Sequence, residues 1–298
     1  MPSKFRLTLV SLLACWLTAC GPNASSSDDD DDDDIDARAD AAIDGLPGID
    51  AIDAPFADPS RVYAHSGTML YRIDTLTMAA VPVGAFTNLA TQAMQDIALD
   101  RDEQMFGITR DKIFTIDAAT GACTKVADFT GGSLSSLSFV PVDIGNPDGE
   151  EMLVAAAANG DVVHITITGM TADATVLGNY GTMGATQIAS SGDLVYIKGV
   201  GIFATVNVGA AATNDYLATV DPANDWRATL VGTGTGFNNI FGVAYWGGKL
   251  YGFVDDGFDA ATGKFIELNQ TTGAGTVLLM GAVRWFGAGV TTEAPIIP

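Results

Sequence analysis

A unit of four short apolar runs recurs along residues 61–298 and is the strongest constraint on the fold. Its clearest copy extends from Phe241 to Leu279, where apolar, aromatic and β-branched runs lie between Gly, Asp, Asn and Thr residues. Runs of this kind between turn-forming residues predict a four-stranded antiparallel meander. Copies of its third-strand ending recur at intervals of 43 to 53 residues, at Ile73-Asp74, Ile116-Asp117, Ile167-Thr168, Val220-Asp221 and Leu268-Asn269. The sequence therefore predicts an all-β domain built from repeats.

The first strand of each repeat can be aligned in the same way. The copies are Ile97-Ala98-Leu99, Leu137-Ser138-Phe139, Ile188-Ala189-Ser190 and Val243-Ala244-Tyr245, and second-strand copies include Val195-Tyr196-Ile197. The first repeat begins at Arg61 without such a strand, whereas Phe286–Val290 near the C-terminus matches Phe241–Tyr245. We expect the C-terminal strand to complete the N-terminal repeat, which would leave no open end.

Repeats of this length with four strands each resemble the blades of β-propellers. The resemblance covers residues 61–298 and implies a five-bladed β-propeller. The Gly-His and Trp-Asp pairs of WD40 repeats and the Gly-Gly sets of kelch repeats do not occur. An irregular β-sandwich and a propeller of six or seven blades remain alternatives.

The N-terminus has the features of an export signal. Lys4 and Arg6 precede an apolar run from Leu7 to Leu17, which is too short for a membrane span of ~20 residues but suits a signal peptide over residues 1–19. Leu17-Thr18-Ala19-Cys20 resembles the lipobox of bacterial lipoproteins. That resemblance implies cleavage before Cys20 and a diacylglycerol on its sulfur, and Gly21 in place of Asp favours the outer membrane, facing the periplasm or the cell surface. A secreted protein with a chance cysteine is the alternative.

Residues 20–60 are predicted to be a disordered acidic tether. Small polar residues from Pro22 to Ser27 precede Asp28–Asp34, which is an unbroken run of aspartates. Low hydrophobicity with dense like charge cannot offset the entropy of ordering. A flexible run supplies no preformed calcium cage, so a solvated spacer is favoured over a Ca²⁺ site. The net charge of −22 makes nucleic acid an unlikely partner.

Propeller sites usually lie where the first strands begin, at the mouth of the central channel. The aligned positions there are Asp96, Ser136, Gln187, Gly242 and Gly287. Five-bladed glycoside-cleaving enzymes, which this architecture resembles, place three carboxylates at the channel. Only Asp96 supplies one here, so the alignment predicts no catalytic set.

Three other features are given structural interpretations. His65 and His164 lie in different repeats without metal-ligand spacing, and each is expected at the surface or at a strand edge. Cys123 is expected to be a small buried hydrophobe without a disulfide, since Cys15 and Cys20 lie in the export signal. Gly232–Gly236 joins two predicted strands and no helix follows, so it is a connection rather than a phosphate loop.

Two acidic loops are weak calcium candidates. Their potential ligands are Asp143, Asn146 and Asp148 in one loop and Asp255, Asp256 and Asp259 in the other. Neither fits EF-hand spacing, so solvated turns are favoured and no cofactor is predicted.

These observations predict a monomeric, lipid-anchored envelope lipoprotein that displays a non-catalytic propeller as a binding or scaffold module. Its partners would be the membrane, through Cys20, and an unidentified protein or glycan ligand. The alternatives are a propeller enzyme that acts on extracellular glycans and a calcium-stabilised adhesion module.

Overall fold

The computed structural model describes residues 60–209, 213–257 and 260–297. The predictions for the signal peptide, for lipidation of Cys20 and for the aspartate-rich tether lie outside these residues, as does Asp259. In the described part of the chain, no helix is long and apolar enough to cross a membrane.

The described residues form an all-β structure of four hydrogen-bonded sheets. One sheet contains, in order, β21 (Gly287–Gly289), β1 (Tyr63–His65), β2 (Met69–Asp74) and β3 (Ala79–Ala85). The next contains β4 (Asp96–Leu99), β5 (Met105–Ile108), β6 (Lys112–Ile116), β7 (Cys123–Phe129), β11 (Thr171–Asn179), β10 (Asp161–Thr168), β9 (Glu151–Ala156) and β8 (Ser138–Pro141). The third contains β12 (Thr182–Met183), β13 (Thr186–Ile197), β14 (Gly201–Val208), β15 (Tyr216–Asp221) and β16 (Arg227–Val231). The last contains β17 (Ile240–Trp246), β18 (Lys249–Asp255), β19 (Gly263–Leu268) and β20 (Gly275–Gly281).

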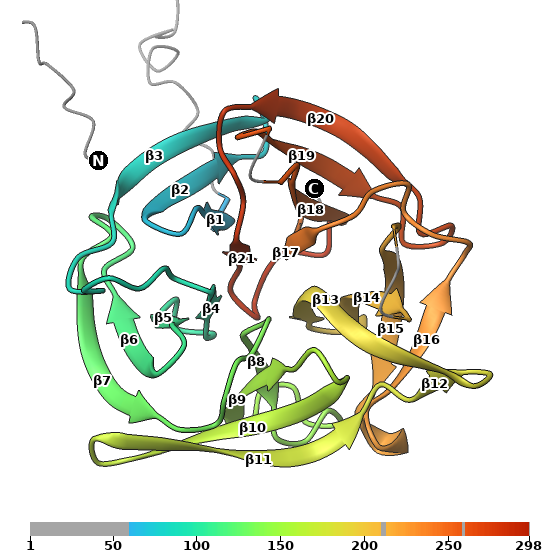
Figure 1. The fold of residues 1–298 in the computed structure, drawn as a ribbon, viewed down its shortest axis with the longest axis horizontal. Helices are drawn as coiled ribbons and strands as arrows, with labels where there is room; N and C mark the ends of the chain where they lie inside the picture. The colour runs from blue at the N-terminus through green and yellow to red at the C-terminus, as the bar shows by residue number, and fades with distance from the viewer. Residues whose placement is uncertain (1–59, 210–212, 258–259, 298) are drawn as a thin grey trace, which may run out of the picture. The chain divides into compact units, whose positions relative to one another are not determined.

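The sheets are arranged radially around a common centre (Figure 1). The strands nearest the centre are β21, β4, β8, β13 and β17, and they contact one another in cyclic order. The eight-stranded sheet is two antiparallel meanders joined by a short parallel pairing of β7 with β11. The predicted closure is present, because β21 pairs with β1 through Tyr63 opposite Gly289 and His65 opposite Gly287.

Short polar side chains end the third strand of most repeats, as the sequence predicts. Oδ1 of Asp74, Asp117 and Asn269 each accepts two backbone N–H groups from the residues just ahead. Asp221 does the same for Ala223 at the start of a 3₁₀ turn, η1 (Pro222–Asn224). These local bonds offer the backbone a turn in place of a further ladder bond.

Glycine supplies the tight hairpin at the start of the clearest repeat. Gly247 and Gly248 both have positive φ, 59° and 81°, between β17 and β18. A two-residue hairpin with positive φ at both positions matches the twist of the flanking strands, and only glycine adopts it without strain.

Burial decreases from the centre of the ring outward. All four residues of β4 and five of the seven residues of β17 are buried, whereas the outer strands β3 and β20 contain only half-buried and exposed residues. Strands that are buried on both faces read as continuous apolar runs, which is why the inner strands are rich in Ile, Val, Leu and Ala. The core thus lies between neighbouring sheets and towards the centre.

One strand assignment from the sequence is wrong. Val195-Tyr196-Ile197 was predicted as a second strand, but it belongs to the first strand β13, and β14 is the second. The pairing of β13 with β14 shifts between Ser190 and Leu194, so residues 191–193 form a bulge in one long strand. A bulge changes the direction of the side chains and interrupts their alternation between the two faces of the sheet. For this reason the single strand β13 has the sequence pattern of two strands.

Candidate ligand site at the ring axis

Two aspartates of inner strands, Asp96 at the start of β4 and Asp193 in the bulge of β13, accept backbone N–H groups at the axis. Asp96 Oδ2 accepts the Leu137 N–H, at 2.6 Å, just before β8. Asp193 Oδ2 accepts the Val243 N–H of β17 at 2.8 Å, and its Oδ1 accepts the Leu194 N–H at 2.6 Å. Both side chains are buried. Carboxylate oxygens therefore satisfy backbone donors that the converging first strands would otherwise leave unpaired.

His65 packs beside Asp96 in this buried cluster. Its Nδ1 lies 2.9 Å from the Ser66 carbonyl oxygen, which can only accept, so Nδ1 carries the proton and donates. Nε2 therefore has a lone pair, and it faces Asp96 Oδ1 at 3.7 Å. Two lone pairs repel each other unless Asp96 holds a proton, so the neutral acid is the form that suits this contact.

The electrostatics of the cluster also favour neutral groups. Burial raises the pKa of Asp96 well above its usual range, and the neighbouring Asp193 carboxyl raises it further. Burial likewise raises the pKa of Asp193, and it lowers the pKa of His65 to about 4. The spacing of His65 and Asp96 is that of an ion pair, but removal of both groups from water opposes their charged forms.

Gly287 makes room for this cluster. A Cβ at Gly287 would overlap both Asp96 Oδ1 and His65 Nε2. Gly242, at the matching position of β17, would likewise overlap the backbone of Gly287 and Ala288. The two glycines therefore allow the close approach of strands at the axis.

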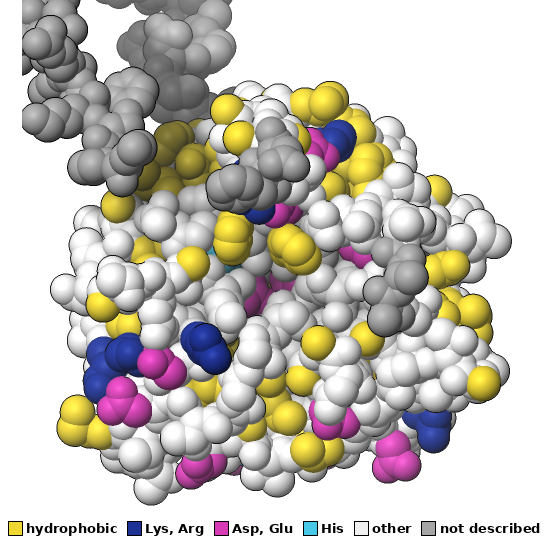
Figure 2. Space-filling model, viewed as in Figure 1, with side chains coloured by type: hydrophobic (Ala, Val, Ile, Leu, Met, Phe, Trp, Pro, Cys, Tyr) yellow, Lys and Arg dark blue, Asp and Glu magenta, His cyan; other side chains and the backbone are white. Residues whose placement is uncertain are grey.

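A pocket of about 440 Å³ is lined by Gln95 and Phe286, the residues directly before Asp96 and Gly287. Inner strands or the residues just before them line much of it, through Gln95, Ser135, Ser191, Phe241 and Phe286. The rest of the lining is contributed by Gln92, Ala93, Met94, Arg110, Ser133 and Leu134. Near the ring centre, Figure 2 shows a hollow with hydrophobic side chains at its border and acidic atoms in its depth.

The channel-mouth predictions have a mixed outcome. Asp96 and Ser136 are buried at the axis, and Ser136 Oγ accepts the Ala156 N–H at 2.6 Å. Gln187 is exposed and bonds instead to Asn159 O and Asn179 Oδ1, so it does not line the pocket. The residue that matches Asp96 in this repeat is Asp193, which the sequence alignment missed.

His65 also differs from its prediction. It was expected at the surface or at a strand edge, but its side chain is fully buried and contacts Asp96. A partner 31 residues further along the chain gives no local signal, which is why this contact was not predicted.

The acidic loops use their carboxylates in contacts within the chain. Asp255 forms a bidentate ion pair with Arg284, at 2.8 and 2.6 Å, and Asp256 pairs with Lys264. Asp143 Oδ1 accepts the Gly145 N–H. Within the described ranges, no three His, Cys, Asp or Glu side chains are placed to hold a metal ion.

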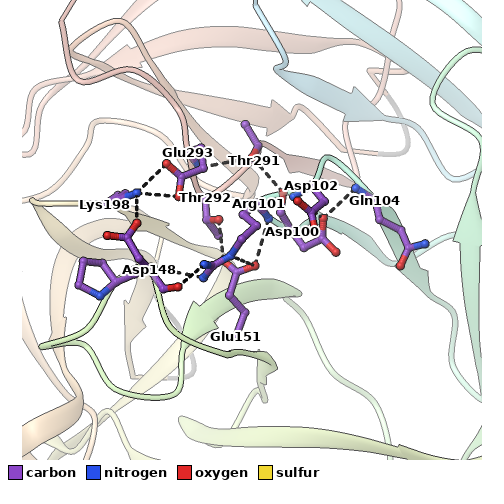
Figure 3. A network of polar contacts seen from close by, with 11 residues as sticks. Asp100, Arg101, Asp102, Gln104, Asp148, Glu151, Lys198, Thr291, Thr292 and Glu293 are labelled. Atoms are coloured by element: carbon purple, nitrogen blue, oxygen red, sulfur yellow. Dashed lines mark hydrogen bonds and ion pairs between the residues drawn. The ribbon is translucent and has the colours of Figure 1, made fainter.

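Asp148 belongs to a polar network that joins four segments (Figure 3). Lys198, after β13, pairs with Asp148 and Glu293, and the Asp148 carbonyl accepts from Arg101. Arg101 N–H and Thr292 Oγ1 both donate to Glu151. This network ties the residues after β21 to the loops of neighbouring sheets.

Two smaller predictions agree with the structure. Cys123 is buried and free, and burial raises the pKa of its thiol to about 11. Gly232–Gly236 lies between β16 and β17 as a connection.

The sequence matches no protein-family model and no curated protein. Among solved structures, the chain is similar to a symmetrical protein described in work on de novo evolutionary emergence, with 14% identity, a TM-score of 0.48, and coverage of 78% of this chain and 99% of that one. It is also similar to a protein of unknown function from Bacteroides caccae, with 12% identity, a TM-score of 0.37, and coverage of 74% and 72%. A protein from Lactobacillus plantarum shows 13% identity, a TM-score of 0.38, and coverage of 76% and 70%. Similarity at this level identifies neither a family nor an activity.

Proposed function

We propose that residues 60–297 form a five-bladed β-propeller that binds a small ligand in the axial pocket and catalyses no reaction on it. The cyclic contact of five inner strands supports the blade count. In this interpretation β21 joins β1, β2 and β3 in one blade, and the parallel contact of β7 with β11 links two adjacent blades.

The observation that carries the binding function is the pocket itself. It combines two aromatic walls, Phe241 and Phe286, with hydroxyl and amide side chains, at the point where the inner strands begin. Its volume of about 440 Å³ falls in the range of small-molecule sites, which are typically apolar with a few convergent polar groups.

The roles of the two axial carboxyls argue against glycan hydrolysis, which is the leading alternative. Two carboxyls do meet at the axis, and this favours an enzyme more than a lone Asp96 would. Glycosidases, however, hold their carboxyls roughly 5–9.5 Å apart around an accessible bond. The side chains of Asp96 and Asp193 are buried and accept backbone N–H groups, so neither is placed beside an accessible bond.

A pocket-filling substitution tests the binding function. Ser133 lines the pocket and is exposed, so Ser133→Trp should fill the pocket without disturbing the core. In a melting screen of monosaccharides, amino acids, nucleosides and small carboxylates, at least one compound should raise the wild-type Tm, since a ligand at ~100 Kd adds about 2.7 kcal/mol. That compound should not raise the Tm of Ser133→Trp.

Thr175→Trp, on the exposed outer strand β11, is the matched control and should respond like wild type. A wild-type response that survives in Ser133→Trp would place the site elsewhere and contradict the proposal. No response to any compound class would do the same.

We further propose that Cys20 carries a lipid that anchors the protein to the outer membrane through residues 20–59. The motivation is the lipobox-like Leu17-Thr18-Ala19-Cys20 after an apolar run. Several acyl chains at ~0.8 kcal/mol per buried CH₂ give stable attachment. Cys20→Ala should leave the membrane fraction and lose the mass of the lipid in intact-protein mass spectrometry. A Cys20→Ala protein that stays membrane-bound and unshifted in size would contradict the anchor.

A further inference from the structure

We propose that the axial pocket binds a small organic carboxylate, with the Arg110 guanidinium on the carboxylate and the rings of Phe241 and Phe286 against its apolar body. This inference rests on the proposed binding function and names the chemical class of its ligand.

Arg110 lies on a tight turn at the edge of the pocket. The turn joins β5 to β6, and the Thr109 N–H closes it by donating to the Lys112 carbonyl oxygen at 2.9 Å. The Gln95 N–H donates to the Ile108 carbonyl oxygen at 2.8 Å, so the turn is fixed to the segment that leads into β4. The backbone at Arg110 is therefore held beside the start of an inner strand, while the residue itself is exposed.

Arg110 provides the charge of the pocket wall. Among the described residues that line the pocket, it is the one with a charged side chain. No described residue forms a hydrogen bond or an ion pair with its guanidinium. The adjacent Asp111 is bound by Lys112 Nζ at 2.6 Å and by Gln92 Nε2 at 2.8 Å, so Arg110 adds only a weaker Coulombic attraction to it. The N–H donors of the Arg110 guanidinium are therefore open to an acceptor in the pocket.

A guanidinium with open donors selects an anion. Its planar fork of N–H groups matches two oxygens of a carboxylate or a phosphate. Arg110 would repel a cation, and no carboxylate lines the pocket among the described residues to attract one. A neutral ligand would use Arg110 less well than an anion, because hydrogen bonds between charged partners are the stronger ones.

Two phenylalanine rings favour a carboxylate over inorganic phosphate. Phe241 and Phe286 both line the pocket and are half-buried, so each leaves part of its surface accessible. The Arg284 guanidinium lies over the Phe286 ring, 5.6 Å from its centroid, and its charge is compensated by both oxygens of Asp255. The two rings therefore provide an apolar surface beside the charge of Arg110. Such a surface fits an anion with a hydrophobic body, which inorganic phosphate lacks.

Three compounds that differ in charge test the ligand class on the full-length protein. Phenylacetate is negative, phenylacetamide is neutral and phenethylamine is positive, and inorganic phosphate serves as an anion without an apolar body. In titration calorimetry, phenylacetate should bind most tightly of the four. Arg110→Gln should raise the Kd of phenylacetate by about tenfold or more, since a hydrogen bond to a charged group is worth at least one tenfold step. The same variant should leave the weaker binding of phenylacetamide nearly unchanged.

Two further variants are matched controls for Arg110→Gln. Arg227→Gln removes the same charge from an exposed position of β16 outside the pocket, and it should bind phenylacetate like wild type. Arg110→Lys keeps the charge but loses the planar fork, so its Kd should fall between those of Arg110→Gln and wild type.

The outcomes separate this inference from the function on which it rests. If phenylacetamide or phenethylamine binds as tightly as phenylacetate and Ser133→Trp abolishes that binding, the pocket binds ligands but the carboxylate class is wrong. If phosphate binds more tightly than phenylacetate, the role of the rings is wrong. If phenylacetate fails to bind, or binds to Arg110→Gln as it does to wild type, the inference is wrong. If no ligand of any class depends on Ser133, the proposed function fails as well.

Discussion

Asp193→Ala should destabilise the protein by about 3 kcal/mol, because two buried backbone N–H groups lose their acceptors together. Asp193 Oδ1 accepts the Leu194 N–H of its own strand, and Oδ2 accepts the Val243 N–H of the next inner strand. An unpaired buried donor costs about 1–3 kcal/mol. Equilibrium urea unfolding of the purified protein, with unchanged m-value, is the measurement.

The loss is not offset by relief of charge repulsion at Asp96. Burial is the larger cause of the raised pKa of Asp96, and the Asp193 carboxyl is the second. The Asp193→Ala substitution removes the effect of the Asp193 carboxyl on Asp96 but leaves the effect of burial. Asp96 stays buried and bound to the Leu137 N–H, so the gain there is smaller than the loss at Leu194 and Val243.

Two variants calibrate this result. Asp193→Asn keeps one acceptor oxygen and places an amide NH₂ against the other N–H, so its destabilisation should fall between that of Asp193→Ala and wild type. Asp173→Ala, exposed on β11 with a bond to Thr130, should stay within about 0.5 kcal/mol of wild type. An Asp193→Ala protein as stable as Asp173→Ala would show that the carboxylate does not hold the inner strands together.

The parts of the fold that depend on local chemistry were predictable from the sequence. Asp74, Asp117 and Asn269 end strands because their side chains bond the next few backbone N–H groups, and neighbours in sequence suffice to show this. The match of Phe286–Val290 to the start of another repeat predicted the pairing of β21 with β1, because strands at equivalent positions of a repeat pair with the same neighbours.

The buried part of the site was harder to predict. The bulge at residues 191–193 separates two apolar runs of β13, so the alignment placed the start of the strand at Ile188 and overlooked Asp193. A signal was available, since Asp96-Ile97-Ala98 and Asp193-Leu194-Val195 share an Asp followed by aliphatic residues. The burial of His65 depends on Asp96 and on the missing side chain of Gly287, which are contacts between distant segments. Periodicity carries no information on such contacts.

Acidification should destabilise the wild-type protein through His65, and His65→Gln should remove that component. Burial lowers the pKa of His65 to about 4 from an ordinary value of 6.5. A group with a lowered pKa in the folded state contributes stability that is fully present above its unfolded value. That stability is lost as the pH falls from about 6.5 through about 4. The difference between these two pKa values of His65 corresponds to roughly 3 kcal/mol in the free energy of unfolding. The change in the free energy of unfolding between pH 7 and pH 4, measured by urea unfolding, should be less destabilising for His65→Gln than for the wild-type protein by about this amount.

Buried carboxyl groups in the same region have raised pKa values, so acidification stabilises the folded state through them and destabilises it through His65. The contribution of His65 is therefore measured by comparing variants. Burial raises the pKa of Asp96 and of Asp193 beside His65, and it raises the pKa of Asp215 to about 6. Their contributions are fully present below the unfolded value near 3.8 and are lost as the pH rises through the folded values. Asp215→Asn should therefore increase the stability difference between pH 7 and pH 4, whereas His65→Gln decreases it. If Asp215→Asn and His65→Gln changed the stability difference between pH 7 and pH 4 in the same direction, the pH dependence would not arise from the burial of these groups at the ring axis.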